Sequence, residues 1–411
     1  MNTILDEQIQ YKLPKYEIIL VWIGIFLNFF FYGMLNISYY FALPNSMISG
    51  GIRVTVLCIG LLLIFIDILR RDMPPITISI LALLIFAAYY LAVFWICFPN
   101  EFHFQIKIKM FYDIFIANMS TLVIFICGRE RFKYIISKPM LLFLPAFLDV
   151  LIILLVHRDA IATMSFQSTY VETGIARTSV KYPMQYLIAV APFLMFFSKN
   201  IIFKFILGPL GCILALLNLF MGDSRSTFFA FIPILMFYAI TSLRSPLSFS
   251  YAATTYGLSA MFIAPYLVMS TAWIRFMNVL DFKERINEGS VEFGRYDLWI
   301  EGMEQFYNSP IFGGYYSLKS YGLGYCHFTP IAILYSMGII GGILAVTIFT
   351  GAIRGLLYIF RKYRYPAYWI LCLFIADLTF MFFDGNTKDI FCSSIGLMLS
   401  ANAIRVQDNR I

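Results

Sequence analysis

Three residues that are far apart in the chain carry side chains that could act together on an anionic group. Arg225 follows Gly222-Asp223-Ser224 at the start of one apolar run, and His327 opens another. Arg295 lies in the polar stretch between these two runs. A guanidinium group binds two phosphate oxygens at once through its planar fork. Imidazole, with an ordinary pKa of about 6.5, accepts a proton near neutrality. These residue types favour a site in which two arginines hold a phosphate and His327 acts as a base.

Each of these residues also has a simpler interpretation. Arg225 could anchor a helix end in the lipid headgroup layer, with Ser224 as the N-cap. Arg295 could be one more charge on a solvated helix face. His327 could cap a helix or line an interface. Taken one at a time, the three positions leave both interpretations open.

The elements that must position these residues are membrane helices. The chain has 411 residues, of which 61% are hydrophobic and 13% are charged, whereas a soluble domain averages about 45–50% apolar and about 25% charged residues. The apolar residues come in blocks of roughly 20, the length that a helix needs to cross the bilayer core. Because backbone groups in lipid must be satisfied within the segment, each block predicts a helix.

The expected fold is therefore all-α, a polytopic membrane helix bundle of about twelve transmembrane helices. It forms a single integral membrane domain over residues 1–411. The predicted spans are 16–37, 53–69, 75–98, 110–128, 139–156, 183–198, 201–221, 226–243, 250–271, 326–352, 366–383 and 389–404.

Short basic segments set the direction of the helices. The segments that follow predicted helices 2, 4 and 10 fall on one side of the membrane, together with the C-terminal tail. Their cations are Arg70, Arg71, Arg129, Arg131, Lys133, Lys138, Arg354, Arg361, Lys362, Arg364, Arg405 and Arg410. By the positive-inside rule this side is the cytoplasm. We therefore expect a multi-pass protein of the bacterial inner membrane with both termini cytoplasmic.

Two loops on the opposite, periplasmic side are long. One covers residues 157–182, and the other covers residues 272–325 between predicted helices 9 and 10. A connection of about 50 residues exceeds the usual few, and long loops often carry function. In the second loop Trp299, Met303 and Phe306 recur at helical spacing, which predicts a short amphipathic helix over about 295–307. Pro310 disfavours helix in the residue before it and ends the helix nearby.

Several motifs in this region resemble those of the O-antigen polymerase and O-antigen ligase superfamily. Their order is R-x3-W from Arg295, N-S-P-I-x-G-G at 308–314, a glycine-rich stretch, and His327 opening a helix that contains G-I-I-G-G. The segment Gly222-Asp223-Ser224-Arg225-Ser226 is similar to the Ser-Arg motif of the same family. The resemblance covers roughly 220–345, and the expected topology agrees with that of the family. The family usually has Asn after the loop histidine, whereas Phe328 stands here.

The resemblance implies a membrane glycosyltransferase of lipopolysaccharide or related surface polysaccharide biosynthesis, with polymerase favoured. Such an enzyme transfers a growing undecaprenyl-pyrophosphate-linked glycan onto a lipid-linked repeat unit at the periplasmic surface. In this interpretation Arg225 and Arg295 hold the leaving pyrophosphate and His327 accepts the proton of the attacking hydroxyl. Arg177 holds the incoming glycan. The sugar is expected to contact Tyr315, Tyr316, Tyr321 and Tyr325, which otherwise form an interfacial aromatic belt.

The expected partners follow from the same resemblance. They are the undecaprenyl-pyrophosphate-linked oligosaccharide, membrane lipid and a chain-length regulator protein. No cofactor is expected, and the reaction should be metal-independent because pyrophosphate is already a good leaving group. Nucleic acid is not expected, because the net charge of +7 is spread among short loops.

Other functions stay open at this point. An O-antigen ligase, which moves the finished glycan to lipid A–core, shares the fold and motif chemistry. A membrane transporter or flippase is compatible with twelve helices, although the commonest such plan has two similar halves. Asp149 and Asp377 lie near the middle of predicted helices 5 and 11, where acids are costly. Each could pair with a buried cation or belong to an ion path.

Overall fold

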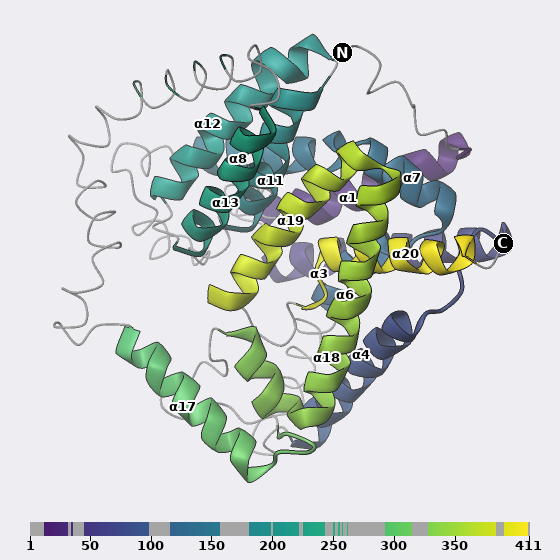
Figure 1. Cartoon of the computed structure of the whole chain (residues 1–411), viewed down its shortest axis with the longest axis vertical. Coiled ribbons are helices and arrows are strands. Elements are labelled where there is room, and N and C mark those ends of the chain that lie inside the picture. The colour runs from purple at the N-terminus through teal and green to yellow at the C-terminus, as the bar shows by residue number, and fades with distance from the viewer. Residues whose placement is uncertain are drawn as a thin grey trace.

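The computed structural model describes most of the helical part of the chain. It covers residues 12–31, 34–35, 45–97, 116–156, 181–198, 200–221, 225–242, 250, 254, 257, 261, 292–314, 328–383 and 390–409. Every regular element within these ranges is a helix (Figure 1). The all-α prediction is confirmed for this part of the chain.

The helices follow one another in the order that the apolar blocks predict. They are α1 Lys15–Phe29, α3 Asn45–Leu69, α4 Ile78–Cys97, α6 Ala117–Phe125, α7 Arg129–Ser137, α8 Met140–Val156, α11 Lys181–Phe197, the π-helix η3 Phe203–Leu207, α12 Gly208–Met221, α13 Arg225–Ser242, α17 Glu292–Asn308, α18 Thr329–Lys362, α19 Arg364–Phe383 and α20 Ser393–Asp408.

Several of these helices are suited to a membrane. Among the described residues, the helical stretches Gly50–Leu69, Thr329–Lys362 and Arg364–Phe382 are long and apolar enough to cross a bilayer. The helices α7 and α8, bent by 52° at the break between them, pass the same test as a pair. Other apolar helices are shorter. The structure thus has helices expected of a membrane protein, and the count of twelve spans stays a prediction.

Several predicted elements differ from the structure; α3, for example, begins at Asn45 and not at residue 53. The basic segment after predicted helix 4, expected as a loop, forms α7. Predicted helix 10 (326–352) instead runs from Thr329 to Lys362 and is broken at Gly338, whose φ of 62° and ψ of −161° are not helical. The predicted span 201–221 contains the π-helix η3, which inserts an irregular turn. The predicted span 250–271 falls almost entirely outside the described ranges.

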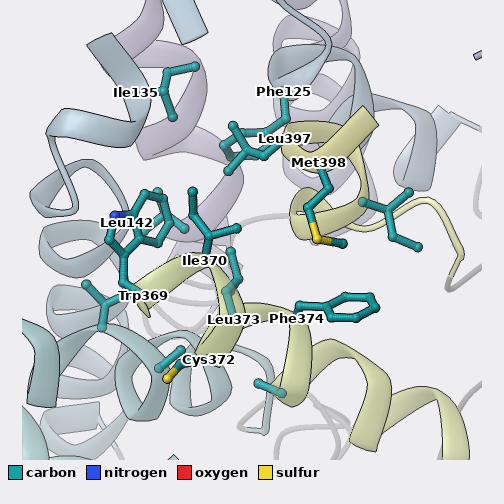
Figure 2. Packing of buried hydrophobic residues seen from close by; sticks show 14 of the residues in the cluster. Phe125, Ile135, Leu142, Trp369, Ile370, Cys372, Leu373, Phe374, Leu397 and Met398 are labelled. Carbon is teal, nitrogen blue, oxygen red and sulfur yellow. The ribbon is translucent and has the colours of Figure 1, made fainter. Parts of the chain in front are cut away.

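The core lies where α19 and α20 pack against α6, α7 and α8 (Figure 2). Trp369 of α19 is fully buried and donates from Nε1 to the carbonyl of Ile136 at 3.2 Å. Phe125, Leu397 and Met398 are fully or almost fully buried nearby.

Helix α20 occupies the interior although much of its sequence is polar. Its residues Ser393 to Ile404 are all buried. A Cβ built on Gly355 of α18 would lie 1.8 Å from the carbonyl oxygen of Met398. The backbones of α18 and α20 therefore touch at this glycine, the close approach that small residues permit in membrane helices.

Candidate functional site

Helix α17 confirms the amphipathic helix predicted in the long loop. It covers Glu292–Asn308 and packs on the first part of α18 at one end of the molecule (Figure 1). Leu298 is buried against Ala332 and Tyr335. A Cβ on Gly302 would lie 3.0 Å from Ile331 Cγ2, so the two helices are in tight contact. The apolar stripe of α17 thus faces α18 and fixes the helix on the bundle.

Phe328 links α17 to α19. Its ring lies 5.4 Å from the ring of Trp299 and 5.6 Å from the ring of Phe382, measured between centroids. Aromatic pairs at such distances add about 0.5–1.5 kcal/mol beyond their buried area. Phe328 is therefore an aromatic bridge immediately before α18.

The loop after α17 inserts into the break in α18. In an unbroken helix the N–H of Ile339 would bond to the carbonyl of Tyr335. Here Ile339 N–H donates to the carbonyl of Pro310 at 2.8 Å, and the carbonyl of Tyr335 accepts from Gly314 N–H at 3.0 Å. The loop thus satisfies these two backbone groups, and the carbonyl of Ile311 also accepts from Ile340 N–H at 3.4 Å. We call residues 309–314 together with 335–340 the loop–helix junction.

Two glycines make the junction possible. Gly313 and Gly338 have φ values of 70° and 62°, a region that disfavours any residue with a Cβ. A Cβ on Gly313 would lie 2.4 Å from the backbone nitrogen of Met337, and one on Gly338 would lie 2.3 Å from the carbonyl oxygen of Ile311. The motifs N-S-P-I-x-G-G and G-I-I-G-G are therefore two halves of one backbone contact.

Side chains reinforce the same loop. The hydroxyl of Ser309 donates to the carbonyl of Gly313 at 2.9 Å. The hydroxyl of Tyr89, on α4, donates to the carbonyl of Phe312 at 2.6 Å. The junction is thus tied to a second helix of the bundle.

The structure places two of the predicted site residues on helices. Arg225 is the first residue of α13, and Arg295 lies in the first turn of α17. Their side chains fall outside the described part of the chain. Six further predicted site residues lie wholly outside the described part of the chain, namely Arg177, Tyr315, Tyr316, Tyr321, Tyr325 and His327. Arg295 stands one helical turn before Trp299, and His327 directly precedes Phe328, the ring that Trp299 contacts.

A second group of charges lies at the basic segments. Glu17, Asp67 and Arg131 are completely buried, and with Arg70 they form the buried charge cluster. Asp67 accepts from Gly128 N–H at 2.7 Å and from Arg70 Nη2 at 2.8 Å, and its Oδ2 lies 2.8 Å from Arg131 Nη2. Arg70 also binds Glu17 through both terminal nitrogens at 2.9 Å.

The C-terminal end of α20 joins the same region through the Asp408 network. Asp408 accepts from Lys362 Nζ and from the Tyr358 hydroxyl, each at 2.6 Å, and pairs with Arg129. The backbone N–H of Lys12 donates to Glu130 at 2.7 Å. Basic segments that were predicted to share one side of the membrane are therefore in contact with each other or with the same helices.

Sequence reasoning singled out the cations of this region and missed their acidic partners. Glu17 and Asp67 stand at the ends of apolar runs, where a carboxylate is costly unless paired. This energetic cost was the signal in the sequence that could have identified Glu17 and Asp67 as members of a buried ion pair. Asp408 lay in a polar tail and gave no comparable signal.

The Asp408 network makes stability depend on pH. Burial alone would raise the pKa of the Asp408 carboxyl, but hydrogen bonds from Lys362 and Tyr358 and the charge of Arg129 outweigh it and hold the pKa below its ordinary value. A carboxyl with a lowered pKa stabilises the fold above its unfolded pKa of about 3.9, and this contribution is lost as the pH falls through the folded pKa. We expect Asp408→Asn to melt below the parent at pH 7. The difference should shrink as the pH drops below about 4. Melting curves of both proteins in detergent from pH 7 to pH 3 test this, and a constant difference would contradict it.

Asp149 and Asp377, the acids near the middle of predicted helices 5 and 11, are both buried. Asp377 accepts a hydrogen bond from the hydroxyl of Ser394 at 2.6 Å, at the start of α20. Its exposed fraction is 6%, and that of Asp149 is zero. The partner seen for Asp377 is thus a serine hydroxyl, and pairing of either acid with a buried cation stays a prediction.

No group of three or more His, Cys, Asp or Glu side chains within the described ranges is placed to hold a metal ion. Comparison of the chain with models of known protein families and with curated proteins finds no match.

Proposed function

We propose that the chain is a polytopic inner-membrane glycosyltransferase that polymerises an undecaprenyl-pyrophosphate-linked glycan at the periplasmic surface. The observation that carries the proposal is the contact of Trp299 with Phe328. It ties the helix that bears Arg295 to the residue next to His327. The loop–helix junction holds the other end of α17 against α18. The two motifs thus belong to one packed unit.

The packing of α13 supports the inclusion of Arg225, the third residue of the proposed site. Phe237 of α13 contacts Tyr368 of α19, with ring centroids 5.4 Å apart. The predicted topology runs these two helices in opposite directions. Arg225 lies about 18 Å along α13 from this contact, and Phe382 lies about 21 Å along α19 from it. In the proposed topology Arg225 therefore stands level with Phe382, whose ring contacts Phe328.

The chemistry assigned to the three residues is as follows. The bond between the anomeric carbon and the pyrophosphate oxygen breaks, and the electron pair leaves with the pyrophosphate. Arg225 and Arg295 neutralise the developing charge through bidentate contacts. The hydroxyl of the acceptor sugar forms the new bond to the anomeric carbon, and His327 takes its proton. The lipid tail keeps the diphosphate at the membrane surface, where this unit is proposed to lie.

The contacts among the basic segments support the orientation. One end of each of five predicted helices lies at the buried charge cluster or at the Asp408 network. These are predicted helices 1, 2, 4, 10 and 12. The N-terminal segment reaches the same region through Lys12 and Glu130. We therefore assign this region, with both termini, to the cytoplasm and the junction to the opposite face.

The test is restoration of glycan polymerisation in a strain that lacks the chain's own gene. We expect Arg225→Ala, Arg295→Ala and His327→Ala to insert at parental levels and to leave single capped repeats, because transition-state stabilisation is lost while the fold is kept. Arg361→Ala is the matched control, since Arg361 is an exposed arginine in the last turn of α18, and it should restore the full ladder.

The outcomes separate the candidate functions. Full ladders from all three variants would end the site assignment. Deletion of the gene that leaves no capped repeat, not even a single one, would instead show a ligase.

A further inference from the structure

The end of α17 and the loop after it expose large apolar side chains. Tyr307, Ile311 and Phe312 have exposed fractions of 72%, 56% and 62%, and we call these three residues the loop tip. Glu304, one turn earlier on α17, is also exposed. Contiguous exposed apolar side chains mark protein–protein or membrane interaction sites.

The loop tip continues the apolar surface of α18. Ile339, Ile343 and Val346 of α18 are 46%, 61% and 66% exposed, and they belong to a helix that is long and apolar enough to cross a membrane. The hydrogen bond from Ile339 N–H to the carbonyl of Pro310 sets the loop directly beside the first of these residues. The surface that faces lipid along α18 therefore runs on to the loop tip.

The length of α18 indicates the depth of the junction. Arg354 is exposed and is the first charged residue along α18, so we place the inner boundary of the hydrocarbon core at this residue. The stretch of about 16 residues from Gly338 to Ile353 rises about 24 Å, whereas the hydrocarbon core is about 30 Å thick. A bilayer whose inner boundary lies at Arg354 thus extends past Gly338 and encloses the loop–helix junction.

The hydrogen bonding of the junction fits this depth. Irregular backbone is tolerated at membrane depth where its polar groups are satisfied within the protein. The N–H of Ile339 and the carbonyls of Tyr335 and Phe312 all have protein partners. A loop in water would need no such pairing.

We propose that the loop tip is embedded in the lipid of the outer leaflet, with Ile311 and Phe312 at the acyl boundary and Tyr307 at the headgroups. Glu304 stays in water and marks the limit of insertion. The inference rests on α18 crossing the membrane in the proposed orientation and is independent of the reaction that the chain performs. It makes the end of α17 an interfacial helix end docked on lipid.

The test is photocrosslinking of the full-length protein in bilayers of phosphatidylcholine with labelled acyl chains. A photoreactive phenylalanine analogue is placed at position 312, or at position 311 as a second site. Position 343 serves as the lipid-facing control and position 304 as the aqueous control. The adduct with labelled lipid at 312 and 311 should match that at 343 and exceed that at 304 severalfold. Each protein must elute at the parental volume, which exposed positions are expected to allow.

Two outcomes would overturn the proposal. One is a lipid adduct at 312 and 311 as low as that at 304 while 343 labels strongly. The other is a covalent dimer from 312, which would show that a second copy covers the loop tip. This experiment does not measure glycan ladders. A negative result would therefore overturn the lipid contact of the loop tip without bearing on the proposed reaction.

Discussion

Gly338→Ala should destabilise the protein by about 4 kcal/mol or more. The backbone at Gly338 has φ 62° and ψ −161°, a region that is essentially restricted to glycine. The added Cβ would also lie 2.3 Å from the carbonyl oxygen of Ile311. Relief of that clash moves the loop away and breaks the bonds to Ile339 N–H and the Tyr335 carbonyl. Thermal melting of the purified protein in detergent measures the loss, which should appear in cells as reduced accumulation.

Gly342→Ala is the matched control for this prediction. It changes the other end of the same G-I-I-G-G motif, and the nearest atom to the added Cβ is Leu334 Cδ2 at 3.4 Å, an ordinary contact. Alanine in a helix interior is favoured over glycine by roughly 0.5–1 kcal/mol. Gly342→Ala should therefore melt at or above the parental temperature. Equal melting temperatures for the two variants would show that the junction is not formed as described.

Asp67→Ala should cost about 3–5 kcal/mol, because it leaves a buried charge without its partner. Arg131 is completely buried, and its Nε and Nη1 atoms already have no hydrogen-bond partner in the structure. Its Nη2 lies 2.8 Å from Asp67 and donates to the carbonyl of Ile126 at the same distance. Removal of the carboxylate also takes an acceptor from Gly128 N–H. Melting in detergent again gives the measurement.

Two comparisons isolate the cause of this effect. Lys133→Ala removes a partly exposed ion pair with Glu130 and should cost less than about 1 kcal/mol. The double variant Asp67→Asn with Arg131→Met keeps an acceptor for Gly128 and removes the buried charge. It should be more stable than Asp67→Ala. A double variant that melts below the single one would contradict an unpaired charge as the source of the loss.

Periodicity and apolar block length were sufficient to predict most of the described helices, α7 excepted. The spacing of Trp299, Met303 and Phe306 predicts α17 to within three residues at its start and one at its end, because a helix on an apolar surface must present a stripe. Block length predicts α19 as 366–383, and the structure has Arg364–Phe383. The break at Gly338 was not predictable in the same way, since a glycine in an apolar run is also common at helix contacts.

The candidate site could be predicted only as residue types and motifs. The pairing of Pro310 with Ile339 and of Gly314 with Tyr335 involves main-chain atoms, and main-chain pairing over such a separation has no side-chain pattern. Phe328 shows the reverse case. The sequence marked it only as a residue that differs from the motif that this region resembles, and its role as a bridge between Trp299 and Phe382 depends on which helices meet. Packing between segments that are distant in the sequence determines both the main-chain pairing of the junction and the role of Phe328.

The burial of α20 has a consequence for how the protein is made. This helix follows all the other described helices in the chain, yet its residues Ser393 to Ile404 are buried. The helices inserted before it must therefore leave an internal space that stays open until α20 is inserted. Chains released before this helix is complete should be recognised by quality-control proteases as unfinished, because their interior is still accessible.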